Sequence, residues 1–307
     1  MKTLLPLLAW LAFLFLAGNE FLLEHWEGAL VVFAALALVP MGLELLNQPQ
    51  GIFYHFTSAG LGAAYLMYPA ATAPYAALPY LVLSLWLAIQ EGAQILVFRK
   101  FQLLQWVRLA ALVFWATGAL WVFCFLADIR PLGFDPVIVG LTAAHFHVAG
   151  FVMATAVYCL LSQEASRMNK ILGWATLAGM PLVAVGITLT QLGFSPVFEW
   201  TSALGFALFA WAVAWQHLRL FLSKSHPRRA RLHWLAGALC LVLGVLLAAV
   251  YALRFYFPIS WVNIPNMKIW HGTLNAVGFG WLILQGWRFA KLAKNRFSPG
   301  QQHRFGA

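Results

Sequence analysis

Ten long apolar runs constrain this chain more than any other feature of its sequence. A hydrocarbon core of about 30 Å is crossed by about 20 residues of α-helix. Within hydrocarbon, every backbone N–H and C=O group must be paired inside its own helix or around a closed barrel. The strands of a membrane barrel alternate polar and apolar residues, and these runs do not alternate. The sequence therefore predicts an all-α, polytopic transmembrane helix bundle.

The runs predict ten membrane helices within one transmembrane domain that comprises residues 1–307. Hydrophobic residues make up 63% of the chain and charged residues 9%, whereas about 25% of the residues in an ordinary soluble domain are charged. No charge-rich or Ser/Pro-rich linker divides the chain. The predicted helices lie near residues 3–18, 27–46, 51–70, 77–98, 103–126, 137–162, 170–192, 197–221, 232–253 and 267–287.

The basic residues predict the orientation of the bundle. When the N-terminus is placed in the cytoplasm, all but three of the 19 Lys and Arg residues fall on the cytoplasmic side, as the positive-inside rule requires. The exceptions are Arg130, Arg254 and Lys268. Both termini are therefore predicted to be cytoplasmic, and the net charge of +10 reports topology and anionic lipid rather than nucleic acid. Phe15 stands where a signal-peptidase site requires a small residue, which favours an uncleaved first helix.

Ionisable residues within the predicted helices are the candidates for function, because burying them in a bilayer is costly. One group lies toward the outer face and comprises Glu24, His25, Glu27, His145, His147, His271 and Asn275. A second group lies toward the inner face and comprises Glu44, His55 and Glu91. The sequence lacks a phosphate-binding Gly-rich loop, a Gly-x-Ser-x-Gly nucleophile motif and a His-Glu-x-x-His zinc motif.

The sharpest local pattern is the pair His145 and His147 in the sixth predicted helix. Two residues correspond to about 200° of rotation around an α-helix, so the two imidazoles point to nearly opposite sides. They lie about 12 to 15 Å below the outer boundary at 1.5 Å per residue. We therefore expect the pair to serve two different sites, with at most one member joining His271.

In the tenth predicted helix, His271 and Asn275 are four residues apart and share one face. Gly272, Gly278 and Gly280 allow another helix or a flat cofactor to come close. One interpretation is a ligand site for heme, copper or zinc, with Asn275 orienting the imidazole. The alternative is interhelical hydrogen bonding by a buried histidine and a buried amide.

The remaining ionisable residues also have two interpretations each. Glu44, His55 and Glu91 indicate a proton or cation path, although Glu44 and His55 are near enough to the inner boundary to reach water. Glu24, His25 and Glu27 resemble a mixed oxygen and nitrogen metal ligand set, or else a solvated cluster at the interface.

The segments His145-Phe146-His147-x-Ala149-Gly150-Phe151 and His271-Gly272-x-Leu274-Asn275-Ala276-x-Gly278-Phe279 resemble the YndJ-like family of bacterial membrane proteins. This resemblance implies a multi-pass protein of the bacterial cytoplasmic (inner) membrane. Members of that family are sometimes labelled transporters.

The His-Phe-His helix is also similar to one in the catalytic subunit of heme-copper oxidases, where the two histidines reach different hemes. The chain lacks the adjacent His-His pair and the His-Pro-Glu-Val-Tyr segment of those enzymes. The resemblance therefore implies one heme or metal site at most.

Three functions remain open at this point. The first is a heme or transition-metal protein in a redox or sensing role, using His145 or His147 with His271. The second is a proton-coupled transporter that uses Glu44, His55 and Glu91. The third is an intramembrane metal-dependent hydrolase with a His-bound water beside Glu24 or Asp128. The expected partners are the lipid bilayer and an ion or small molecule; the sequence decides neither the oligomeric state nor whether the protein is an enzyme.

Overall fold

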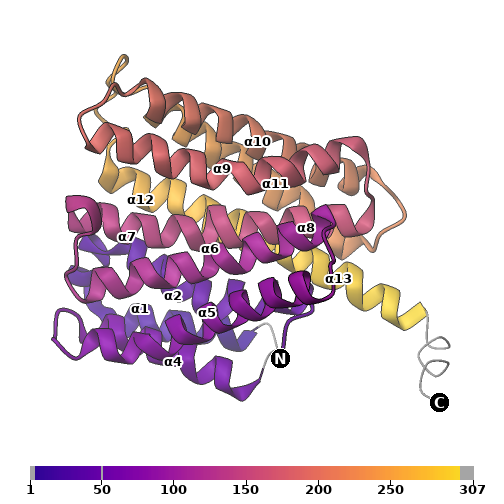
Figure 1. Cartoon of the computed structure of the whole chain (residues 1–307), viewed down its shortest axis with the longest axis horizontal. Helices are drawn as coiled ribbons and strands as arrows, with labels where there is room; N and C mark the ends of the chain where they lie inside the picture. The colour runs from indigo at the N-terminus through magenta and orange to yellow at the C-terminus, as the bar shows by residue number, and fades with distance from the viewer. Residues whose placement is uncertain (1–3, 50, 298–307) are drawn as a thin grey trace.

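The computed structural model describes residues 4–49 and 51–297, and in this part of the chain ten helical rods lie side by side (Figure 1). The predicted all-α bundle and its ten helices are thereby confirmed. Seven rods are single helices, and the second, sixth and tenth are each built from two α-helices joined by a π-helical segment. In chain order the elements are α1 (Leu4–Glu24), α2 (Trp26–Phe33), η1 (Ala34–Leu38), α3 (Val39–Leu45), α4 (Ile52–Met67), α5 (Ala73–Val97), α6 (Leu103–Leu126), α7 (Pro136–His145), η3 (Phe146–Val152), α8 (Met153–Gln163), α9 (Arg167–Gln191), α10 (Val197–Leu222), α11 (Arg228–Ala252), α12 (Ile264–Thr273), η4 (Leu274–Trp281) and α13 (Leu282–Phe297); η2 (Pro131–Gly133) is a 3₁₀ turn.

Eight of the rods are long and apolar enough to cross a membrane. The shorter α4 has 16 residues, which span about 24 Å at 1.5 Å per residue. The protein is therefore a multi-pass membrane protein. The second rod is the most enclosed: 89% of the residues in its most apolar stretch are buried inside the protein, whereas 11% of those in the corresponding stretch of α1 are buried. The first helix thus lies on the outside of the bundle and the second in its interior.

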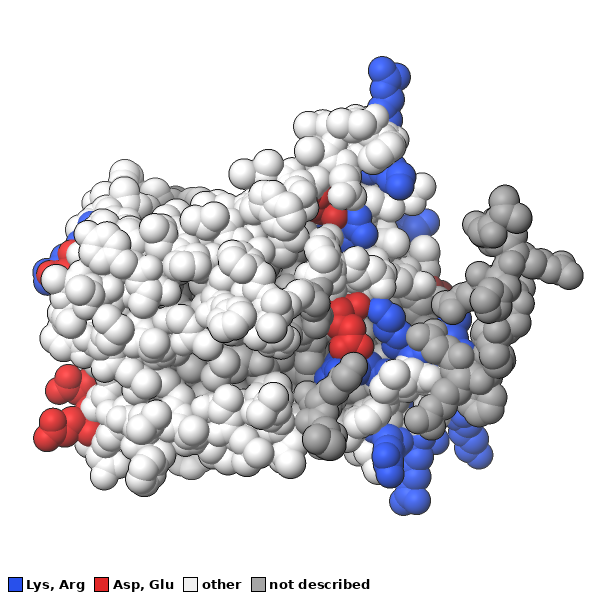
Figure 2. Space-filling view, turned by 90° about the horizontal axis from the view of Figure 1, so that it is seen from below, with Lys and Arg blue, Asp and Glu red and all other residues white. Residues whose placement is uncertain are grey.

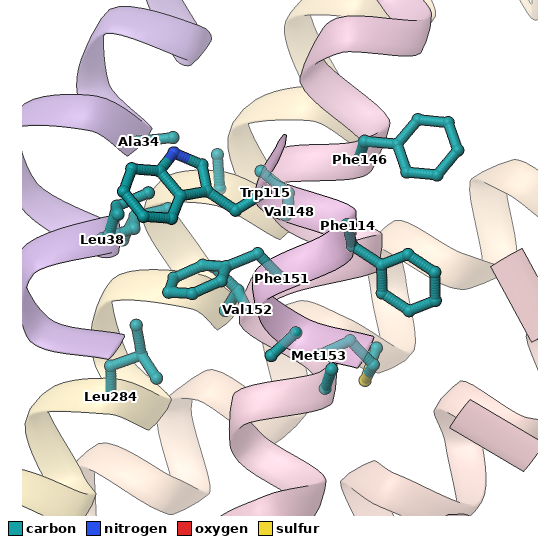
Figure 3. Packing of buried hydrophobic residues seen from close by; sticks show 14 of the residues in the cluster. Ala34, Leu38, Phe114, Trp115, Phe146, Val148, Phe151, Val152, Met153 and Leu284 are labelled. Carbon is teal, nitrogen blue, oxygen red and sulfur yellow. The ribbon is translucent and has the colours of Figure 1, made fainter. Parts of the chain in front are cut away.

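The three π-helical segments pack against one another in the middle of the bundle. Figure 3 shows this region, where in this view the Phe151 ring of η3 lies between Trp115 of α6 and Leu284 of α13, and Leu38 of η1 lies beside Trp115. The Phe151 ring fits because Gly42 has no Cβ atom, which would lie 2.4 Å from it. A π-helical turn holds one more residue than an α-helical turn and is frequently found at functional sites. The helices that carry His145, His147 and His271 are therefore among those with irregular backbone.

The predicted boundaries differ most from the observed ones in the first and last rods. The first prediction ended at Gly18, where α1 has a kink at φ 74° and ψ 166°, a conformation open to glycine; the helix then continues to Glu24. The last prediction ended at residue 287, where the apolar run ends, but α13 continues to Phe297. Arg288, Lys291 and Lys294 make that extension polar, so hydropathy alone could not include it.

Charged residues divide between the two ends of the bundle, and Lys and Arg gather at one of them (Figure 2). We call this the basic end; the other, the acidic end, holds Glu24, Asp128, Asp135 and Glu199. The predicted cytoplasmic residues Lys2 and Arg304 lie outside the described residues. The cytoplasmic placement of the basic end stays a prediction.

Candidate functional site

His145 and His271 lie next to each other, although they are far apart in the sequence. His145 is the last residue of α7, and His271 lies near the end of α12, so both rings approach the π segments η3 and η4 from the acidic end. The two ring centroids are 6.0 Å apart, and the ring planes are inclined by 31°. His145 is exposed and His271 is half-buried, so space remains beside the pair. We call these two side chains the histidine pair.

Backbone carbonyls determine which nitrogen of each ring carries the proton. Nδ1 of His145 lies 2.7 Å from the Leu141 carbonyl oxygen, and Nδ1 of His271 lies 2.7 Å from the Gly244 carbonyl oxygen of α11. A carbonyl oxygen only accepts, so both Nδ1 atoms must be protonated. In a neutral imidazole the other nitrogen, Nε2, then has a free lone pair. Neither Nε2 has a hydrogen-bond partner among the described residues, which is the state of a histidine ready to bind a metal ion.

Asn275 holds the backbone around His271. Its Nδ2 atom donates to the His271 carbonyl oxygen at 2.8 Å and lies 3.1 Å from His271 Nδ1. Because Nδ1 already donates to Gly244, the second distance is a close contact and not a hydrogen bond. Gly244 lies against the amide, since a Cβ atom there would be 2.7 Å from Asn275 Nδ2. Asn275 and Gly244 therefore fix the orientation of the His271 ring.

His147 is directed to a different part of the bundle. Its Nδ1 atom donates to the Ala143 carbonyl oxygen at 2.8 Å, and the Tyr80 hydroxyl donates to its Nε2 atom at 3.2 Å. The Tyr80 ring stacks on the imidazole at 6.0 Å, and the side chain of His147 is fully buried. Both nitrogens of His147 are thus occupied, in contrast to those of the histidine pair.

At the acidic end, Glu24, His25 and Glu27 lie close to one another and to Lys268. His25 Nδ1 is 3.5 Å from Glu27 Oε1, and His25 Nε2 is 3.9 Å from Glu24 Oε2. The Lys268 ammonium lies 3.1 Å from Glu27 Oε2 and also donates to the Glu24 carbonyl oxygen. A lysine cation therefore sits where this cluster needs positive charge.

Aromatic rings pack against the histidine of the same cluster. The His25 ring contacts Tyr68 and Phe125 at centroid distances of 5.3 and 5.5 Å. Burial, and secondarily the Asp128 carboxylate, raise the pKa of Tyr68 above its usual value, so this phenol stays neutral.

Two of the inner candidates, Glu44 and Glu91, each form an ion pair with a different arginine. Arg108 binds the buried Glu91 carboxylate through its Nε atom at 2.8 Å, and Gln48 donates to the same carboxylate at 2.9 Å. Arg288 pairs with Glu44 at 2.8 Å. His55 is exposed. The structure therefore shows two separate ion pairs and an exposed imidazole, and a proton path through them stays a prediction.

Among the residues described, no group of three or more His, Cys, Asp and Glu side chains could hold a metal ion together. Asp128, considered above for hydrolysis, pairs with Arg130 at 3.5 Å. The geometry brings His145 and His271 together with Asn275, and it places Glu24, His25 and Glu27 in a separate cluster.

The sequence did not predict the hydrogen-bond and ion-pair partners of the candidate residues. Tyr80 and the Gly244 carbonyl carry no motif, and Lys268 and Arg108 appeared only as topology signals. His217, also missed, donates from Nδ1 to Val213 and accepts at Nε2 from Trp287, so it is a satisfied packing residue. The one usable signal was Lys268 three residues before His271, because a lysine so close to a membrane helix needs a partner.

The fold and this geometry define a class: a polytopic helical membrane protein in which two histidine rings from irregular central helices lie side by side. The model of the family described as "YndJ-like protein" matches residues 29–279, and the chain belongs to this family.

A Bacillus subtilis (strain 168) relative, described as an uncharacterized membrane protein YndJ, is 24% identical over 185 residues. The matched region covers 59% of this chain and 32% of the relative, so the chain spans about a third of the length of that protein. No solved structure matches the chain.

Proposed function

We propose that the protein is a bacterial inner-membrane protein that binds heme or a transition-metal ion between His145 and His271, in a redox or sensing role. The observation that supports this most directly is that both histidines of the pair carry their proton on Nδ1. Both Nδ1 atoms donate to backbone carbonyls, which leaves both Nε2 atoms as free donors of a lone pair to a metal. His147 and His217, by contrast, have both nitrogens hydrogen-bonded.

The depth of the pair also supports a ligand role. His145 lies nine residues into its helix, which corresponds to about 14 Å from the acidic end. A polar side chain at that depth with an unmet lone pair is costly unless something binds it. A bound metal or heme iron satisfies both nitrogens at once.

The neighbouring residues have supporting roles. The Leu141 and Gly244 carbonyls hold the imidazoles in the tautomer that binds a metal through Nε2, and Asn275 fixes the helix at His271. When bound, the metal or heme would supply electron transfer or ligand binding, which the chain's own side chains in this region do not provide.

The test is cofactor content after purification from cells supplied with heme and metals. We expect an absorption spectrum with a Soret band or a stoichiometric metal by elemental analysis. His145→Ala and His271→Ala should both lose it, whereas His147→Gln, whose two nitrogens are already occupied, should retain it. Protein that is folded by size-exclusion chromatography and carries neither cofactor would overturn the proposal.

A further inference from the structure

We infer that the protein has a binding site for one anionic phospholipid of the basic-end leaflet, with an acyl chain in a groove between α4 and α5. These helices are the third and fourth rods, which carry neither histidine of the pair. Three features support the site: the shortness of α4, the apolar groove beside its first turn and the cations at the end of α5.

Helix α4 begins well inside the bundle because it is much shorter than its neighbour. It has 16 residues, whereas α5 has 25. The two helices are joined at the acidic end, where Tyr68 contacts His25, and they run antiparallel from there. The first turn of α4 shares the groove with Leu87, which is ten residues, or about 15 Å, from the end of α5 at Val97. The last turns of α5 therefore extend beyond α4 toward the basic end.

An apolar groove of about 260 Å³ lies where α4 begins. Together with Pro49, the residues that line it are Gly51, Phe53, Tyr54, Leu83, Trp86 and Leu87. The Tyr54 hydroxyl already donates to the Ala35 carbonyl oxygen, so it is not free for a polar ligand. One turn of an α-helix is about 10 Å across and 5.4 Å long and exceeds this volume, whereas an extended hydrocarbon chain fits.

The depth of the groove matches the length of an acyl chain. The hydrocarbon core of a bilayer is about 30 Å thick, so one leaflet provides about 15 Å of it. The distance from the groove to the end of α5 is the same. Ile89 and Val97, on the stretch between them, are exposed. A lipid with its headgroup at the end of α5 can therefore extend its chain along this stretch and place the last methylenes in the groove.

The charges at the end of α5 favour an anionic headgroup. Arg99 and Lys100 follow the helix directly and are exposed, and neither has a carboxylate partner among the described residues. The acidic residue in α5, Glu91, is already paired with Arg108. Each cation beside a membrane raises the affinity for anionic lipid by about fivefold. Two such cations give a preference of roughly 30-fold over a zwitterionic lipid.

The headgroup is tested by native mass spectrometry on full-length protein, delipidated in detergent and incubated with equal amounts of phosphatidylglycerol and phosphatidylcholine. We expect one phosphatidylglycerol per chain to be retained, with a preference of roughly 30-fold. Arg99→Gln combined with Lys100→Gln should remove the preference. Arg228→Gln combined with Arg229→Gln is the matched control, because it removes the same charge from two exposed residues at the start of α11.

The groove is tested in the same experiment. Leu83→Trp should fill it and weaken retention of both lipids by about 10-fold or more, since each methylene excluded costs about fourfold in affinity. Trp86→Ala removes one wall without adding bulk and should also weaken retention. Trp174→Ala in α9 is the control, because Trp174 is 61% exposed and Trp86 is 50% exposed, but Trp174 does not line the groove.

Three results would overturn the site. The first is equal retention of the two lipids by the unchanged protein. The second is a loss of retention that is as large in the control variants as in the variants of α5, because lipid would then bind the whole surface alike. The third is protein that is folded by size-exclusion chromatography and retains no phosphatidylglycerol.

Discussion

At the scale of single residues, the site depends on backbone groups as much as on the two imidazoles. The Gly244 carbonyl oxygen fixes the proton of His271 on Nδ1, and it can approach because glycine leaves room for the Asn275 amide. A histidine without this bond could carry its proton on Nε2 and would lose the free lone pair. Gly244 is therefore a positioning residue although it has no side chain.

We expect Gly244→Ala to weaken binding at the histidine pair by roughly 10–100-fold, the usual effect of disturbing a group behind a ligand. The new Cβ atom would lie 2.7 Å from Asn275 Nδ2 and 3.0 Å from its Cγ atom, so the amide must move. The same overpacking should lower the free energy of unfolding by about 1–3 kcal/mol. Gly205→Ala in α10 is the matched control, because a Cβ atom there has no neighbour within 4 Å. Equal behaviour of the two variants in titration and thermal unfolding would contradict this role.

A second expectation at this scale concerns the buried pair of Glu27 and Lys268. Lys268→Met should lower the free energy of unfolding by about 3–5 kcal/mol, because it leaves a buried carboxylate without its cation. Adding Glu27→Gln should recover part of that loss, which thermal unfolding in detergent can measure. Asp128→Asn removes the exposed pair with Arg130 and should change stability by about 0–1 kcal/mol. A buried pair no more costly to break than the exposed one would refute this expectation.

At the scale of helices, the three rods with π segments form the centre, and regular helices surround them. The second, sixth and tenth rods meet through η1, η3 and η4. Small residues allow this close packing: a Cβ atom on Gly280 of η4 would lie 3.1 Å from a methyl carbon of Leu38 in η1. His145, His147 and His271 therefore lie on the central rods, which suits a site that must hold its geometry.

The kink in α1 gives an expectation for an outer helix. Gly18 has φ 74° and ψ 166°, a region essentially restricted to glycine, and a Cβ atom there would meet nothing within 4 Å. Gly18→Ala should therefore cost about 1–3 kcal/mol through backbone strain alone. Thermal unfolding measures this cost against Gly205→Ala, which has equal space in a regular helix. Unchanged stability of Gly18→Ala would show that the kink can straighten freely.

Hydropathy was sufficient to predict the number and approximate bounds of the helices, because the need to pair backbone groups in hydrocarbon leaves few alternatives. It could not reveal the π segments, since η3 and η4 have the same apolar composition as the α-helices around them. The spacing of His145 and His147 predicted that they face different surroundings. Which of them lies beside His271 depends on how α7 packs against α12, and this packing has no sequence motif.

At the scale of the whole molecule, the three basic residues that lie at the acidic end do not contradict the segregation of charge between the two ends. The three basic residues at the acidic end are each paired with a carboxylate there: Lys268 with Glu27 at 3.1 Å, Arg254 with Glu199 at 2.7 Å and Arg130 with Asp128 at 3.5 Å. Each pairing lowers the cost of keeping a cation in or beside the membrane helices. The other described Lys and Arg residues gather at the basic end, as Figure 2 shows.

This distribution predicts an orientation that reporter fusions can test. Fusions after Lys224, between α10 and α11, and after Lys294, in α13, should both report the cytoplasm. A fusion after Phe257, between α11 and α12, should report the outside, because α11 must carry the chain across. Glu199→Gln removes the partner of Arg254 and adds unpaired positive charge at the acidic end, yet one pair should not outweigh the basic residues opposite. A cytoplasmic signal after Phe257 would mean that α11 does not cross. An outside signal at the other two positions would reverse the bundle and place the histidine pair in the cytoplasmic half.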